Sequence, residues 1–577
     1  MSPAVLLAAT VLGASPAQVH TSTTEVHACA FADDGAVLAA TAGGLAVVGT
    51  DGGTRVLTSL DGLPGTQSHA LLQTDEGDWW VGTERGVARV SGETLEVLET
   101  IEGPAARALA LDDGGLLVGT WGEGVMRRQG GSLRALPYDG ATSGGAARRI
   151  TALQQFDGGW VVGTAGAGLW SLRGDRLQRR DQAPADAIVW SLAADGEDLW
   201  VGTLEGVFRG SDSMRRASIV DARGLALHGD AVTVATLGDG IVRLDRTSGT
   251  QTAVEASVGV TVRGIAHEGE RRCVATDAGL QLDRGPGTAS RRALADGLVS
   301  GDISALALDD ATGDVWVGTF DRGLMVRRGT DWHTIEDARL DPQINALAVQ
   351  PVEGRSVVWA ATARGLSRIE DGAVRTFGRK SKMPHEHVFS VHVRDDGTVV
   401  AGTARGFVTI TDGVVTKPPR KRLAERWAIW SIAEDAEGTL WFGTTKGLIA
   451  WPEEGPWRRY SMLDGTLPDN WVTSVRIGAD GLWVGTYAGG VTKLTREADG
   501  GLTPAVLGGG RINPGGLTLT ASHVYAATMG GLLRRPRTTA GNWTALRDHS
   551  PGKDTKAVLP TAHGVWVASR RGMALST

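Results

Sequence analysis

Short runs of alternating apolar and polar residues recur along the whole chain. A typical stretch begins with "ISALAL" at 303–308, passes through an Asp-rich turn, and continues with "VWVGT" at 315–319 and "GLMVRR" at 323–328. Alternation with a period of two predicts half-buried β-strands rather than helices. The gap after Gly-Thr ends in another glycine, which adopts positive φ without steric cost, so we expect a tight hairpin there.

This hairpin phrase is repeated fourteen times, and the copies give the chain its period. The Thr of the phrase, once replaced by Ser, is Thr41, Thr83, Thr120, Thr164, Thr203, Thr236, Thr276, Thr319, Thr362, Thr403, Thr444, Thr486, Thr528 or Ser569. The thirteen intervals average about 41 residues, which is the length of a four-stranded β-propeller blade. In many copies a Trp stands three residues before the Thr, and we expect it to pack one blade against the next. The sequence therefore predicts an all-β chain.

The repeated wording also resembles a known family. "LWVGT" at 199–203 and 482–486, followed by a short gap and Gly, is similar to the two-component regulator propeller repeat. In that family fourteen repeats make two seven-bladed propellers. The resemblance implies two tandem seven-bladed β-propellers, with blades 1–7 in residues 22–290 and blades 8–14 in residues 291–577.

The same resemblance carries functional expectations. The repeat fills periplasmic sensor regions of hybrid two-component systems, whose known members sense carbohydrate fragments and signal through an Ig-like segment and a transmembrane helix to a kinase. We find no kinase, receiver, Ig-like or membrane-spanning segment in this sequence. The expectation is thus a non-catalytic ligand-binding sensor without the kinase portion, with a separate signalling protein as a further partner.

Residues 1–21 allow two interpretations. The apolar run Ala4–Leu12 is too short to span a bilayer and is followed by small residues, including Ser15 and Ala17, as in a secretory signal. Alternatively, the N-terminal residues supply the closing strand of the last blade, because the sequence of the last repeat contains only three strands. The first interpretation predicts a periplasmic or secreted protein, and the second allows a cytoplasmic one.

The two cysteines leave a similar choice. Cys29 falls in the first strand of blade 1 and Cys273 in the second strand of blade 7, and these blades are neighbours in a ring of seven. A disulfide between them would join the ends of the ring, as an oxidising compartment permits. The alternative is two separate buried thiols that act as small apolar residues.

Charge and motifs limit the classes of function. The formal net charge of −7 argues against a general nucleic-acid binder. Residues 1–290 carry about −12 and residues 291–577 about +5, and such asymmetry marks a partner surface. No motif for a nucleophile, a metal or a phosphate is found in its required context, so we expect no cofactor, no metal and no catalytic residue. The pair His385 and His387 lacks a third ligand nearby in sequence.

The second propeller presents a candidate ligand face. In five of its blades the residue before the hairpin glycine is basic, whereas in propeller 1 the corresponding residues include Arg85 but also Glu123, Glu205 and Asp239. The connections at 378–388 and 417–427 add further cations, and several aromatic residues stand beside the hairpins, as Trp121 does in propeller 1. The candidate ligand-binding residues are Arg322, Arg364, Arg405, Lys446, Arg571, Arg379, Lys380, Lys382, His387, Arg420, Lys421, Arg422, Trp427, Trp471, Phe320 and Tyr487.

Lys and Arg from distant segments on one face suit a carbohydrate or another anionic ligand. The alternatives are a protein-protein interaction scaffold and, less favoured, a propeller lyase or hydrolase.

Overall fold

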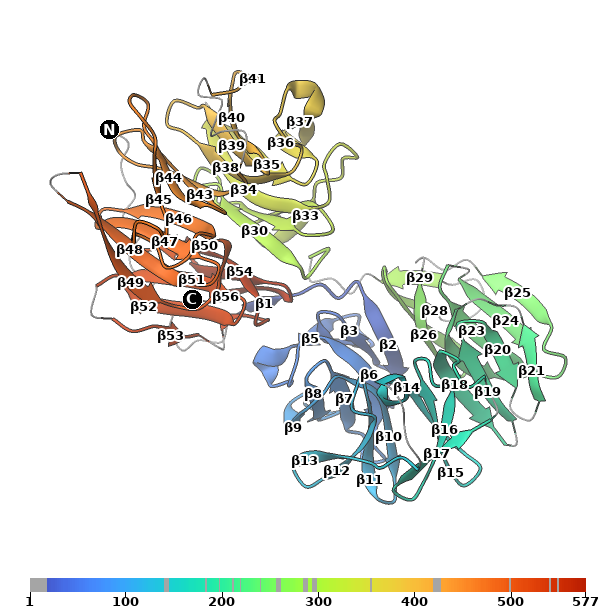
Figure 1. Ribbon diagram of the computed structural model, residues 1–577. Helices are drawn as coiled ribbons and strands as arrows, with labels where there is room; N and C mark the ends of the chain where they lie inside the picture. The colour runs from blue at the N-terminus through green and yellow to red at the C-terminus, as the bar shows by residue number, and fades with distance from the viewer. Residues whose placement is uncertain are drawn as a thin grey trace. The chain divides into compact units, whose positions relative to one another are not determined.

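The computed structural model consists of fourteen four-stranded antiparallel sheets, which form two compact units of seven sheets each (Figure 1). It describes residues 18–139, 145–181, 184–196, 198–209, 212–217, 219, 221–238, 240–255, 261–283, 289–292, 298–352, 355–418, 427–497, 500–538, 541–546 and 549–576. One unit comprises Ser22–Asp296 (propeller 1), and the other comprises Met1–Thr21 with Gly297–Thr577 (propeller 2). The predicted all-β class with tandem propellers is confirmed.

Each sheet is one blade, built from consecutive strands A to D. Propeller 1 contains β2–β5 (26–57), β6–β9 (68–102), β10–β13 (106–135), β14–β17 (150–180), β18–β21 (189–217), β22–β25 (222–255) and β26–β29 (262–292). Propeller 2 contains β30–β33 (303–334), β34–β37 (344–377), β38–β41 (388–416), β42–β45 (429–460), β46–β49 (472–508), β50–β53 (512–545), and β54–β56 (555–576) with β1 (18–20). Three short 3-10 helices, Ser59–Asp61, Gly145–Arg148 and Arg379–Ser381, are the helices of the described residues.

Blade 8 shows how the sequence phrase becomes structure. Its A strand is β30 (Ile303–Leu308), followed by β31 (Val315–Thr319), β32 (Leu324–Arg328) and β33 (Asp331–Thr334). The A strand of every blade contacts the A strands of both neighbouring blades, so the A strands form the inner wall of each ring. Apolar side chains pack between blades: Trp80 of blade 2, for example, shares a buried cluster with Leu116 and Val118 of blade 3.

The hairpin Thr has a structural role that explains its repetition. In all fourteen blades its hydroxyl, or that of Ser569, donates a hydrogen bond of 2.7–3.1 Å to the carbonyl of the hairpin glycine. In many blades the same oxygen also accepts a backbone N–H from within the turn, as from Arg364 to Thr362. The side chain therefore satisfies backbone groups that the turn buries.

The two rings close in different ways. In propeller 2, β1 (Gln18–His20) pairs antiparallel with β56 (Gly572–Ser576) and becomes the fourth strand of blade 14. In propeller 1, a disulfide joins Cys29 of β2 (Val26–Phe31) to Cys273 of β27 (Arg271–Thr276), with Cα atoms 6.3 Å apart. The structure thus contains the disulfide rather than two free thiols. The closing strand comes from residues 18–20, whereas the run Ala4–Leu12 and the signal interpretation lie outside the described residues.

Candidate functional site

A regular backbone contact places three side chains of each blade at one end of the ring. In thirteen of the fourteen blades, the N–H of the residue after the hairpin Thr donates to the carbonyl of the residue that precedes, or begins, the A strand; Tyr487 to Trp471 is one case, at 2.9 Å. We call the rim the set formed by these two residues and the second residue of each A strand. Every blade contributes to the rim from sequence segments about 15 residues apart.

A β-bulge directs the third rim residue. The register between A and B strands shifts at the start of the A strand, as between Ile303 and Ala305, so the second residue is left out of the ladder. Its side chain reaches the next blade: the Ser304 hydroxyl donates to the Ile344 carbonyl at 2.6 Å, and Asn345 Nδ2 donates to the Val388 carbonyl at 2.7 Å. Bulged residues of neighbouring blades are therefore close together at the rim.

In propeller 2 the rim carries a continuous run of rings, which we call the aromatic strip: His387, Phe389, Trp430, Trp471 and Tyr487. Their successive ring centroids are 4.3, 4.1, 5.7 and 4.4 Å apart. The strip crosses three blades, through β38 (Val388–Val393), β42 (Ile429–Glu434) and the start of β46 (Val472–Gly478). All five side chains are half-buried, so each keeps part of its surface open.

Three polar atoms of the strip lack partners. Trp430 Nε1, Trp471 Nε1 and His387 Nε2 are buried and make no hydrogen bond with any residue that the structure describes. Burial, together with the nearby His385, lowers the pKa of His387, while Asp341 opposes this, so the ring is neutral at neutral pH. A buried N–H without a partner costs free energy that a ligand hydroxyl can recover.

Charged side chains continue the rim beyond Tyr487. The guanidinium of Arg511 lies 5.6 Å from the Tyr487 ring centroid. In the next blade Asp554 accepts hydrogen bonds from Asn513 Nδ2 at 2.9 Å and forms ion pairs with Lys556 at 2.8 Å and Arg570 at 3.1 Å. The rim of propeller 2 therefore joins an aromatic sector to a sector of charged and amide groups.

Asp302 belongs to the same charged sector. Its carboxylate lies 3.9 Å from Arg570 Nε. Burial raises the pKa of Asp302, and the negative charges of Asp321 and Asp554 add to this, while Arg570 and Lys556 oppose it. A carboxyl group with a raised pKa beside a second carboxylate is the arrangement in which an acid and a base can differ in protonation.

The basic residues expected from the sequence lie at the hairpin tips, and no contact in the described part of the chain joins them into one cluster. Arg322, Arg364, Arg405 and Lys446 are exposed, and Arg571 is half-buried. Each uses its backbone N–H on the hairpin Thr or Ser hydroxyl.

Two of the expected arginines form ion pairs: the tip residue Arg364 pairs with Asp341 at 3.3 Å, and Arg379 pairs with Glu386 at 3.4 Å. Lys380 and Lys382 are exposed near Arg379 in sequence. Phe320 is 45% exposed at a hairpin, whereas Trp427 packs on an apolar cluster with Arg459 over its ring. Arg420, Lys421 and Arg422 lie outside the described residues. Of the sequence candidates, the structure brings His387, Trp471 and Tyr487 together.

Sequence reasoning missed Phe389, Trp430 and Arg511. Phe389 and Trp430 each stand at the second residue of an A strand, a position that was not singled out from the sequence. Comparing that one position across the fourteen copies would have found them, because large aromatic residues occupy it in two consecutive blades of propeller 2.

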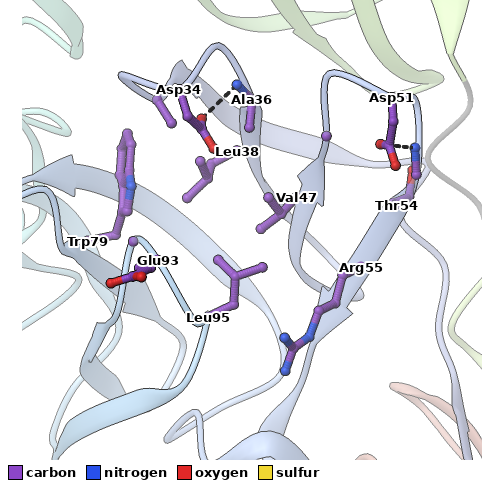
Figure 2. Close-up of a pocket in the computed structure, with 14 residues that line it drawn as sticks. Asp34, Ala36, Leu38, Val47, Asp51, Thr54, Arg55, Trp79, Glu93 and Leu95 are labelled. Carbon is purple, nitrogen blue, oxygen red and sulfur yellow. Dashed lines mark hydrogen bonds between the residues drawn. The ribbon is translucent and has the colours of Figure 1, made fainter.

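Cavities of propeller 1 lie away from its rim. One, of about 380 Å³, opens between blades 1 and 2, where Leu38, Val47, Leu95 and Trp79 supply apolar walls (Figure 2). Two of the carboxylates that border it are engaged: Asp34 accepts the Ala36 N–H at 2.9 Å, and Asp51 accepts the Gly53 N–H at 2.8 Å, while Glu93 is a third bordering carboxylate.

A second cavity, of about 710 Å³, is lined by Asp112, Asp175 and Arg127, among others. Arg127 pairs with both of these carboxylates. Both cavities are thus bordered by polar groups that stabilise blade turns and blade contacts.

The described residues hold no group of three or more His, Cys, Asp or Glu side chains that could bind a metal ion. Nor do they include a helix with the length and apolar character needed to cross a membrane.

Comparisons with known proteins agree with the repeat and the fold. The two component regulator propeller family matches residues 427–446, which belong to one of the fourteen copies of the same phrase. No curated protein sequence matches the chain.

Among solved structures, PorZ, a surface component of the type-IX secretion system of Porphyromonas gingivalis, has a TM-score of 0.71 at 12% identity, covering 98% of this chain and 87% of that one. An ancestral GH74 enzyme has a TM-score of 0.65 at 13% identity, with 98% and 99% covered. The extracellular domain of a hybrid two component system from B. thetaiotaomicron has a TM-score of 0.42 at 17% identity, with 96% and 82% covered. At these identities the likeness to PorZ and to the enzyme concerns the fold.

Proposed function

We propose that the chain is a ligand-binding sensor protein that recognises a carbohydrate at the rim of propeller 2. The match of residues 427–446 to the two component regulator propeller family supports this proposal. The sugar rings stack on the aromatic strip, and hydroxyl groups accept hydrogen bonds from the indole N–H groups. The charged sector at Arg511 and Asp554 orients polar substituents, and the tip cations meet any acidic group of the ligand. A separate signalling protein binds the ligand-bound form of the chain.

The observation that carries this proposal is the aromatic strip with its unpartnered N–H groups. Rings in a row that are half-buried and half-open fit the apolar faces of a chain of sugars, and unpaired donors beside them select hydroxyl-bearing ligands over purely apolar ones. The half-open rings are the distinguishing feature, because Trp200 and Trp316 are buried in blade cores and also have indole N–H groups without a partner in the described part of the chain.

The disulfide supports an exported location. Cys29 and Cys273 are bonded, and structural disulfides persist in the periplasm or outside the cell rather than in the cytosol. We therefore propose a periplasmic or secreted protein.

A glycan array followed by calorimetry tests the function. We expect at least one neutral or acidic oligosaccharide to bind, and Trp471→Ala to weaken it by about thirtyfold, since truncation of a central Trp at a binding site costs about 2 kcal/mol or more. Trp430→Phe keeps the ring but removes the N–H, and we expect a smaller loss of about fivefold to tenfold. Trp427→Phe is the matched control, because that ring packs on an apolar cluster outside the strip.

The aromatic strip would not be the binding site if Trp427→Phe weakened glycan binding as much as the strip variants do. The same conclusion would follow if Trp471→Ala left the affinity for the glycan unchanged. Co-purification of one protein partner without any glycan signal would favour the interaction scaffold instead.

A hydrolase is the second candidate, favoured by one observation. Burial raises the pKa of Asp302, so Asp302 can act as a general acid, and Asp554 is a second carboxyl group in the same rim sector. Hydrolysis of a bound oligosaccharide that is abolished by Asp302→Asn, with binding intact, would establish this candidate. If the saccharide binds but is not hydrolysed over days, the hydrolase candidate is wrong and the sensor function is retained.

A further inference from the structure

The rim of propeller 1 has a chemistry different from that of propeller 2. Its second A-strand positions hold His27, His69, Arg107, Arg223 and Arg263 in five of the seven blades. The other rim positions of propeller 1 include the acids Glu25, Glu84, Asp221 and Asp277, so the basic side chains are concentrated at the second A-strand position. A rim of this kind is not needed for ring closure, because propeller 2 closes without it.

Trp121 is the centre of the cationic sector. It follows the hairpin Thr of blade 3 and is 42% exposed, which is unusual for a Trp of this chain. The guanidinium carbons of Arg107 and Arg149 lie 5.6 and 5.8 Å from its ring centroid. Backbone pairing between Trp121 and Arg149 fixes the second of these neighbours, and β10 (Ala106–Asp112) fixes the first.

Both arginines keep their charge available. Each is exposed, and neither forms an ion pair with a carboxylate of the described residues. Glu25, another rim residue, binds Arg263 at 2.6 Å. The surrounding protein and the positive charge of Arg263 lower the pKa of Arg107, while Glu25 and Glu84 act in the opposite direction. Cations of separate blades therefore converge on one place.

A histidine pair holds Arg107 in position. His27 Nδ1 donates to the Ser68 carbonyl at 2.7 Å, so the nearby His69 Nδ1, 3.3 Å from it, serves as an acceptor. Arg107 Nη1 donates to that same His69 nitrogen at 3.3 Å. His69 is 6% exposed and rigidly placed, so Arg107 is oriented before any ligand arrives.

We propose that the rim of propeller 1 is a second binding site, which takes a uronic acid residue of an acidic polysaccharide. The pyranose ring lies against the exposed part of Trp121, and the carboxylate bridges Arg107 and Arg149. Arginine is suited to this task because its planar fork of donors matches a carboxylate. The exposed indole distinguishes a sugar acid from an acidic peptide, which would need the cations alone.

The test uses the full chain and calorimetric titration with oligogalacturonate, oligomannuronate and oligoglucuronate, each beside its methyl ester. We expect one acid to bind, its ester to bind at least tenfold more weakly, and affinity to fall as NaCl rises from 50 to 500 mM. Arg107→Gln with Arg149→Gln, and separately Trp121→Ala, should each reduce the affinity by about thirtyfold. The control is Arg128→Gln, because Arg128 also stands over an indole, that of Trp80, but is paired with Glu99.

Three outcomes overturn the proposal: none of the three acids binds, the ester binds as well as the acid, or tetraglutamate binds as tightly as the uronate. A loss caused equally by Arg128→Gln also overturns it. Trp471→Ala separates the two sites, since uronate binding at propeller 1 should survive this change even where propeller 2 no longer binds its ligand. Unchanged melting of each variant verifies that the fold is intact.

Discussion

The bond between Cys29 and Cys273 gives the sharpest stability prediction, because it belongs to one propeller and leaves the other as an internal control. It joins residues 244 positions apart, across the meeting point of blades 1 and 7. Replacing both cysteines by Ala removes the cross-link, so the unfolded chain of propeller 1 gains the freedom that the closed loop denied it.

The loop-entropy relation gives the size of the effect. For a loop of this length it yields about 5 kcal/mol at room temperature. Propeller 1 spans Ser22–Asp296, and a domain of that size unfolds with an entropy near 0.6 kcal/mol per kelvin, so we expect its Tm to fall by roughly 10 °C. Val48→Ala removes side-chain volume from the same buried cluster without touching the bond, and measures the packing part of the loss.

Differential scanning calorimetry without reductant is the appropriate assay, since it resolves the transitions of the two propellers. The double Ala variant should shift one transition by several degrees more than Val48→Ala does and leave the other in place. If both transitions moved together, or if the double variant matched Val48→Ala, packing alone would hold blades 1 and 7 of propeller 1 together. The predicted stabilisation by the disulfide would then be wrong.

Three smaller predictions concern single residues. Thr444→Val removes a buried hydroxyl that donates to the Gly447 carbonyl at 2.8 Å, and should cost about 1–3 kcal/mol of the stability of propeller 2 in urea unfolding. Burial, assisted by a nearby arginine, lowers the pKa of His20 to about 4 from 6.5, so the folded state binds fewer protons. Stability contributed by the neutral ring is full above pH 6.5 and falls as pH drops toward 4, by about 2 kcal/mol at pH 5; His20→Gln should flatten this pH dependence. Gly86 has φ of +124°, and an added Cβ would lie 2.1 Å from the Ile101 carbonyl oxygen, so Gly86→Ala should lower the propeller 1 transition. The decrease should exceed that of Gly77→Ala, because Gly77 also has a positive φ, of +85°, but its added Cβ meets open space.

The repeated phrase made the blades predictable, since strand alternation, a glycine turn and a fixed period are all properties of local sequence. The hairpin Thr, by contrast, was recognised as a marker without its reason, which is the hydrogen bond across the turn. Closure by Gln18–His20 could not be predicted in detail, because three residues carry too little pattern to announce a strand. The cysteine pairing was left open for a similar reason: sequence gives the neighbouring blades but not the distance between two Cα atoms.

The site was predicted less well than the fold, and the bulge explains why. An A strand without a bulge would place Phe389 and Trp430 on a side of the sheet that alternation assigns, and a shift of one residue changes that assignment. Basic residues before the hairpin glycines can be recognised directly in the sequence, so they were chosen as candidate ligand-binding residues. The contacts among the aromatic rings at the rim depend on the three-dimensional arrangement of neighbouring blades, which the sequence does not show. Whether the tip cations join in ligand binding stays a prediction.

The pairing of β1 with β56 makes propeller 1 an insertion within the chain of propeller 2. During synthesis residues 18–20 precede all of propeller 1, and their partner strand at 572–576 follows it. Propeller 1 can therefore complete its ring during synthesis, before residues 572–576 have been made to close propeller 2. A message truncated within the last blade would yield a protein with one finished disc and one open one, and quality control would encounter an exposed strand edge only in the latter.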